Sequence, residues 1–98
     1  MRCKNELEKI QKKLIELTER WFEINGHGKL FEPSLTVTID NRMNWYAEIY
    51  SYQMDFHDGG RHHYFEAETF EELIEKIWNS IKEEEKILVE TEKRLKEF

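Results

Sequence analysis

The sequence predicts an α+β fold: a helix, a three-stranded antiparallel sheet and a long C-terminal helix, with both helices on one face of the sheet. Three observations predict it. Apolar residues recur at helical spacing near each end of the chain, apolar and polar residues alternate between these stretches, and turn-forming residues separate the alternating segments. With 98 residues and no linker rich in Pro, Gly or Ser, residues 1–98 are expected to form a single domain.

The first helix is predicted from Asn5 to Ile24. Its apolar residues recur at steps of three and four, which is typical of an amphipathic helix: Leu7, Ile10, Leu14, Leu17, Trp21 and Ile24. Asn25-Gly26 is expected to end this helix, because Gly readily adopts the left-handed conformation common at helix C-termini. The predicted helix therefore presents one apolar stripe to a core.

Three strands are predicted after this helix. Leu35 to Ile39 alternates apolar residues with threonine, and the turn-forming residues Asn41 to Asn44 lead into a longer strand from Trp45 to Phe56. Asp58-Gly59-Gly60 predicts a second hairpin, followed by a strand from Arg61 to Ala67. The strands should therefore pair antiparallel in chain order.

The register of the second hairpin stays open. A two-residue Gly59-Gly60 turn pairs Tyr52 with Ala67, whereas a three-residue loop pairs Ser51 with Ala67. In both cases Tyr64 and its neighbour Phe65 lie on opposite faces of the sheet.

The second strand carries aromatic residues on both faces, more than one core can hold. We expect one face to be buried: Leu35, Val37, Ile39, Trp45, Ala47 and Ile49. Tyr46, Glu48, Tyr50 and Tyr52 should then point to solvent as an exposed tyrosine face, which is suited to an interface hot spot. The alternative is cross-strand aromatic pairing that only stabilises a thin sheet, or a bulge that switches the buried face.

The second helix is predicted to begin after Thr69, which with Glu72 has the spacing of a capping box. No Gly or Pro interrupts residues 70–98, which would span about 43 Å as a helix, longer than the sheet. Its apolar stripe follows a seven-residue repeat, with Glu84 and Thr91 at the remaining positions. Both helical stripes are expected to form the core, and the alternative is a homodimer through the C-terminal helix.

The composition bounds the partners and the compartment. The net charge of −6 argues against direct binding of nucleic acid and is compatible with a basic partner protein. The single cysteine, Cys3, cannot form a disulfide within the chain, and no apolar stretch has the length of a signal sequence or a membrane span. We therefore expect a cytoplasmic protein that does not enter a membrane.

The sequence offers little for catalysis or cofactor binding. His57, His62 and His63, with Asp55 and Asp58, could bring metal ligands together near the second turn, but their spacing matches no metal-binding signature. Exposed polar histidines are the expected outcome. We therefore expect no metal, no cofactor and no enzymatic activity.

The element order resembles that of two kinds of small domain. It is similar to the double-stranded RNA-binding domain, but where that family has basic residues near the start of its last helix this chain has Glu68, Glu71, Glu72 and Glu75, so RNA binding is not implied. With its acidic composition, the chain also looks like some small phage-encoded anti-CRISPR inhibitors that imitate DNA. That resemblance implies an inhibitor that binds a basic groove of a nucleic-acid-binding enzyme.

The leading functional hypothesis is a non-enzymatic protein-binding module, a small acidic inhibitor or adaptor that acts on a basic partner protein. The candidate partner-binding residues are Tyr46, Glu48, Tyr50, Tyr52, Tyr64, Glu83 and Glu84. The alternative is an oligomeric protein that binds a small planar ligand on its tyrosine-rich sheet face.

Overall fold

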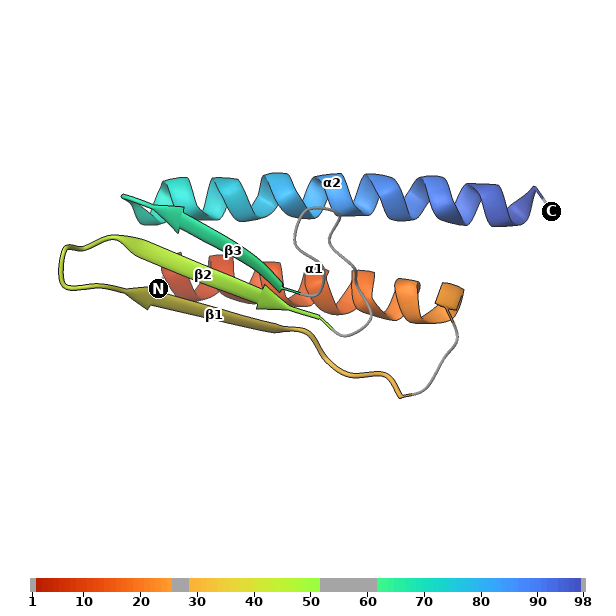
Figure 1. Ribbon diagram of the computed structural model, residues 1–98, viewed down its shortest axis with the longest axis horizontal. Coiled ribbons are helices and arrows are strands. Elements are labelled where there is room, and N and C mark those ends of the chain that lie inside the picture. Colours follow the sequence, from red (N-terminus) through yellow and green to blue (C-terminus); the bar gives the residue numbers. More distant parts are fainter. Residues whose placement is uncertain (1, 26–28, 52–61, 98) are drawn as a thin grey trace.

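The computed structural model describes residues 2–25, 29–51 and 62–97 and confirms the predicted α+β fold. The elements follow the predicted order (Figure 1): α1 (Arg2–Asn25), β1 (Ser34–Ile39), β2 (Trp45–Tyr50), β3 (His62–Ala67) and α2 (Phe70–Lys96). Both helices begin at the same end of the molecule and run in the same direction along its 51 Å length. None of the described helices is long and apolar enough to cross a membrane.

The α1 helix buries the stripe that its sequence predicts. Ile10, Leu14 and Leu17 have no exposed surface, and Trp21 and Ile24 pack against them as partly buried residues. The helix begins at Arg2, a few residues before the predicted start, and ends at Asn25 as expected.

The sheet has the order β1-β2-β3, so β2 is the central strand and pairs antiparallel with both neighbours. The predicted turn after β1 is built around Asp40, whose carboxylate accepts hydrogen bonds from the backbone N–H groups of Arg42 (2.8 Å) and Asn44 (2.9 Å). These bonds hold Met43 at a φ of 64°, a left-handed conformation that is uncommon for residues other than glycine.

The predicted register of the second hairpin is wrong. Trp45 lies opposite Ala67, whereas the predicted turn at Gly59-Gly60 would have placed Ser51 or Tyr52 there. The described pairing ends at Tyr50 on β2 and at His62 on β3. The predicted turn at Gly59-Gly60 and the predicted strand beyond residue 51 lie outside the described residues.

The strand alternation sorts the sheet into two faces, as predicted. The face that points to the helices carries three cross-strand rows: Ile39, Trp45 and Ala67; Val37, Ala47 and Phe65; Leu35, Ile49 and His63. The second and third rows supply the buried Ala47, Ile49 and Phe65. Figure 1 shows the sheet in front of α1, with α2 beside β3, so both helices lie on this side.

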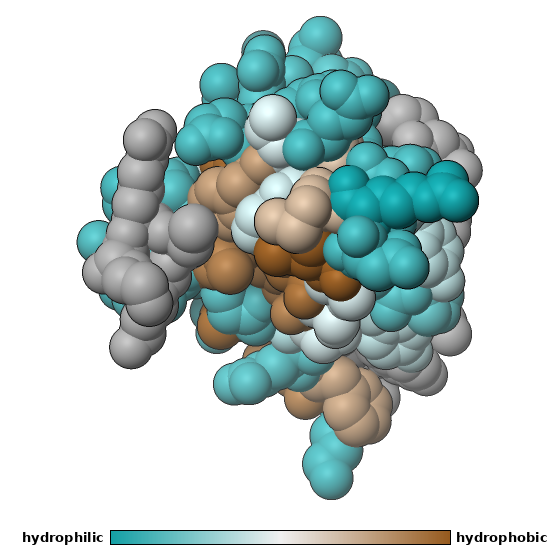
Figure 2. All heavy atoms as spheres, turned by 90° about the vertical axis from the view of Figure 1, so that its left-hand side faces the viewer, coloured by the Kyte–Doolittle hydropathy of each residue, from teal (hydrophilic) through white to brown (hydrophobic). Residues whose placement is uncertain are grey.

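The first row departs from the predicted core. Ile39 was expected to be buried, but it is 42% exposed because it ends β1, which pairs only with β2 among the described strands. Trp45 is half-buried and packs edge-on against Phe70, with ring centroids 5.1 Å apart. Figure 2 views this end of the molecule, where apolar surface is exposed between polar margins.

The α2 helix begins with the predicted cap. The Thr69 hydroxyl accepts a hydrogen bond from the backbone N–H of Glu72 (3.1 Å), while the Glu72 carboxylate reaches the N–H of Glu68 (3.4 Å). At about 1.5 Å per residue its 27 residues span roughly 40 Å, about twice the length of a six-residue strand. As predicted, α2 extends beyond the sheet: Leu88 is fully buried, whereas Leu95, one heptad later, is 54% exposed.

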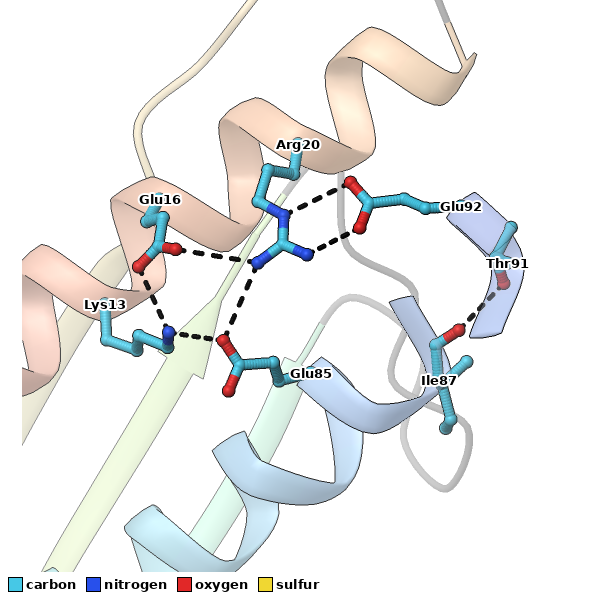
Figure 3. Close-up of polar contacts among 7 residues, drawn as sticks. All are labelled: Lys13, Glu16, Arg20, Glu85, Ile87, Thr91 and Glu92. Carbon is cyan, nitrogen blue, oxygen red and sulfur yellow. Dashed lines mark hydrogen bonds and ion pairs between the residues drawn. The ribbon is translucent and has the colours of Figure 1, made fainter. Parts of the chain in front are cut away.

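One cluster of charged residues joins α1 to α2 (Figure 3). Arg20 of α1 donates two hydrogen bonds to Glu92 and also lies within ion-pair distance of Glu16 and Glu85, while Lys13 pairs with Glu16 and Glu85. We call these five residues the helix seam. The helices therefore pair within one chain, and a homodimer through α2 stays a prediction.

Candidate functional site

The sheet face that points away from the helices gathers most of the predicted site residues. Three cross-strand rows form this open face: Thr38, Tyr46 and Glu66; Thr36, Glu48 and Tyr64; Ser34, Tyr50 and His62. Every side chain of the open face carries a hydrogen-bonding group, and none is Lys or Arg. The face is therefore polar, aromatic and acidic, unlike the apolar face behind it.

Glu48 occupies the centre of the open face. Its Oε2 atom lies 3.6 Å from Nδ1 of His62 on the neighbouring strand. The carboxylate also raises the pKa of Tyr64, mainly by accepting a hydrogen bond from the hydroxyl, with burial and the negative charge acting in the same direction. Tyr64 therefore stays a neutral hydrogen-bond donor well above neutral pH.

Aromatic rings line one side of Glu48. The His62 ring stacks nearly parallel to that of Tyr64 (centroids 5.9 Å apart, 6° between planes) and lies at a tilt against that of Tyr50 (4.8 Å). Tyr64 nevertheless keeps 67% of its surface exposed. One flat aromatic ring beside one carboxylate is an arrangement that can bind a cation through stacking and charge together.

Tyr46 anchors the other end of the open face to the β1–β2 turn. Its hydroxyl donates a hydrogen bond to Oδ2 of Asp40 (3.0 Å), which raises the pKa of Tyr46. The pKa of Asp40 is lowered, chiefly by the backbone N–H of Asn44. Asp40 therefore keeps its negative charge at the margin of the face, where the Tyr46 ring is held in place.

A shallow hollow of about 280 Å³ lies on the open face. It is lined by Thr36, Thr38, Tyr46, Ala47, Glu48 and Tyr64. Glu48 is the only ionisable carboxylate in this lining, so a bound group would meet one negative charge flanked by two tyrosines.

The structure separates the predicted site residues into three groups. Tyr46, Glu48, Tyr50 and Tyr64 share the open face, whereas Tyr52 lies outside the described residues. Glu83 is exposed on α2, on the helix side of the sheet, and does not share a face with the tyrosines.

Glu84, a predicted partner-binding residue, is buried in the structure. Its side chain is 2% exposed, so it offers no surface to a partner in the folded chain. The cause is its place in the heptad stripe of α2, between the buried residues Ile81 and Leu88. Its neighbour Glu85 belongs to the helix seam, where it pairs with Lys13 and Arg20.

The two described histidines cannot act together on one metal ion. His62 lies on the open face, whereas His63 points to the helix side, where its Nδ1 is 2.9 Å from the Ser80 hydroxyl and its ring stacks on Phe65. Across residues 2–25, 29–51 and 62–97, no group of three His, Cys, Asp or Glu side chains could hold a metal ion. The predicted partner ligands Asp55, His57 and Asp58 lie outside these residues.

Sequence reasoning missed His62 and Asp40 as parts of this face. The strand alternation could have identified His62, because a residue two positions from Tyr64 in the same strand lies on the same face. The role of Asp40 depends on the turn conformation, which its spacing from Tyr46 alone does not predict. Comparisons with protein-family models, characterised proteins and solved structures found no match for this chain.

Proposed function

We propose that this chain is a non-enzymatic protein-binding module whose open face binds a basic partner protein, in the manner of a small acidic inhibitor or adaptor. One observation carries the proposal: the open face combines three tyrosines with Glu48 and Glu66 and contains no Lys or Arg. Tyrosine rings with accessible surface supply contact area at low entropic cost, and carboxylates on a face that carries no Lys or Arg side chain favour a positively charged partner.

The open face supports this role better than the glutamates of α2. On α2, Glu84 is buried and Glu85 is occupied by Lys13 and Arg20. The exposed surface of α2 also mixes lysines with glutamates, for example Lys82 beside Glu83, so it does not present a field of one sign. A basic partner would therefore gain more from Glu48 than from Glu83.

The test is an affinity purification from the native host at low salt, repeated with two charge-reversal variants. Glu48→Lys should weaken partner binding by at least about tenfold, because it places a like charge at the centre of the interface. Glu83→Lys is the matched control, since it makes the same charge change at an exposed position of α2, and it should leave binding nearly unchanged.

The reverse pattern, with loss in Glu83→Lys and none in Glu48→Lys, would move the interface to α2 and overturn the proposal for the open face. Raising the salt concentration should weaken the complex steeply, because exposed charges are screened within about 8 Å at physiological ionic strength. A complex insensitive to salt would count against the acidic inhibitor.

The hollow on the open face favours a second candidate, a small planar cation bound against Tyr64 and Glu48. Such a ligand should remain with the purified protein and be released on denaturation, where mass spectrometry detects it. Tyr64→Ala should abolish this retention, whereas Tyr50→Ala should preserve it, because Tyr50 does not line the hollow. A protein that carries no ligand in either form would remove this candidate.

A further inference from the structure

The β1 strand leaves one edge of the sheet open. It pairs only with β2 among the described strands, and its six residues, Ser34 to Ile39, include neither a charge nor a proline. Native proteins usually protect a free edge with charges, prolines or a covering element, because its unpaired backbone groups can pair with another strand. In a chain that is 37% charged, an edge strand without a charge or a proline of its own needs an explanation.

The alternation of hydrogen bonds identifies which backbone groups face outward. The N–H of Asp40 donates to the carbonyl of Asn44 (3.0 Å), so Asp40 points its backbone toward β2. In an antiparallel ladder every second residue does the same, so the backbone N–H and C=O groups of Thr38, Thr36 and Ser34 also point toward β2. The backbone groups of Leu35, Val37 and Ile39 therefore point away from the sheet.

These three residues are complementary to a second copy of themselves. When two β1 strands lie antiparallel with Val37 opposite Val37 of the second copy, Leu35 lies opposite Ile39 and all three outward-facing residues meet outward-facing partners. In this register the apolar side chains, including the 42% exposed Ile39, stay on the helix side, and threonines meet threonines on the open face.

The charges that flank β1 favour the same register. With the two-fold axis at Val37, Glu32 extends toward Arg42 of the second copy, and both side chains are exposed. Shifting the axis to Thr36 would bring Glu32 opposite Asp40, which is unfavourable for like charges, and Ile39 opposite Pro33, which has no N–H to donate. Within β1 itself no charge opposes the approach of two chains that each carry a net charge of −6.

We propose that the chain forms a two-fold symmetric dimer in which two β1 strands pair about Val37 and join the two sheets into one six-stranded sheet. The symmetry axis is perpendicular to the sheet, so both open faces point the same way and form one continuous surface. This inference does not rest on the proposed function. It uses only the β1 edge, which is separate from α2, where the sequence had suggested dimerisation.

Two double variants test both the dimer and its register. Thr36 and Thr38 are exposed, and in this register Thr36 lies opposite Thr38 of the second copy in a close, non-hydrogen-bonded pair. Thr36→Lys with Thr38→Lys should weaken dimerisation by at least about tenfold relative to Thr36→Lys with Thr38→Glu, because lysine then faces lysine instead of glutamate. Sedimentation velocity over micromolar to millimolar concentrations measures the dissociation constants.

Each outcome decides the proposal. A wild-type chain that stays monomeric at millimolar concentration would overturn it. A dimer that both double variants leave as stable as the wild type would place the interface elsewhere. If both weakened the dimer equally, Thr36 would not face Thr38 and the axis at Val37 would be wrong. Circular dichroism checks that both variants fold, and Leu95→Lys, which alters only the exposed end of α2, should leave the dimer unchanged.

Discussion

Carboxylates occur both on the open face and in the helix seam, but of these two regions only the seam pairs them with Lys and Arg side chains. Glu85 and Glu92 each contact Arg20, and Lys13 completes the group. On the open face, Glu48 and Glu66 have tyrosines, threonines and a histidine as face neighbours and no Lys or Arg. The same residue type thus stabilises the fold in one region and leaves charge available in the other.

This difference indicates where the fold tolerates amino-acid substitutions. Seam charges hold α1 against α2, so their removal costs stability, whereas substitutions on the open face should alter binding and leave the fold intact. The apolar face of the sheet belongs with the seam in this respect, because it supplies the core that both helices cover.

The largest expected effect compares the two faces of the sheet. Ile49→Ala should lower the free energy of unfolding by about 2–5 kcal/mol, because a fully buried side chain leaves a cavity. Tyr64→Ala, on the adjacent strand but 67% exposed, should cost less than about 1 kcal/mol. Urea denaturation followed by circular dichroism measures both, and equal losses would mean that the open face contributes to the fold as much as the core does.

The sequence predicts this division into faces because it depends only on local periodicity. Alternation in β1 and β2 is enough to separate Ala47 and Ile49 from Tyr46 and Glu48, and the three-four spacing in α1 is enough to identify Ile10, Leu14 and Leu17. These assignments hold in the structure, apart from Ile39, whose exposure depends on its place at an edge.

Features that depend on distant parts of the chain were harder to predict. The pairing of Trp45 with Ala67 depends on how much of the chain forms the connection, and Gly59-Gly60 looks like a tight turn whatever surrounds it. Glu84 is different, because its heptad position did indicate burial. Its charge, and the run of glutamates around it, made a solvated face the more ordinary interpretation.

A smaller effect is expected from the helix seam. Arg20→Gln should lower the free energy of unfolding by about 1 kcal/mol, because it removes a two-bond contact with Glu92 from partly covered surface. Arg94→Gln makes the same change at an exposed position of α2 and should have almost no effect. Urea denaturation at low and high salt measures both, and a loss in Arg20→Gln that does not shrink with salt would contradict an electrostatic seam.

The smallest expected effect is the loss of folding stability at acidic pH, which has a different cause at Asp40, beside the open face, than at Glu92 in the helix seam. The pKa of Asp40 is lowered from 3.8, chiefly by the Asn44 backbone N–H, and the pKa of Glu92 is lowered from 4.5, chiefly by hydrogen bonding to Arg20. A depressed folded-state pKa stabilises the fold above the unfolded value, and this contribution disappears as the pH falls through the folded value. Stability should therefore decline below about pH 4.5.

Asp40→Asn and Glu92→Gln should each reduce this decline, since the substituted side chains no longer titrate, and each should also lower stability at neutral pH. High salt should suppress the contribution of Glu92, which depends on the charge of Arg20, more than that of Asp40, which depends mainly on backbone donors. Urea midpoints measured from pH 2 to pH 7 at two salt concentrations provide the comparison. If salt weakened both contributions equally, the turn at Asp40 would be held by charge and not by its hydrogen bonds, and the contrast between the two regions would fail there.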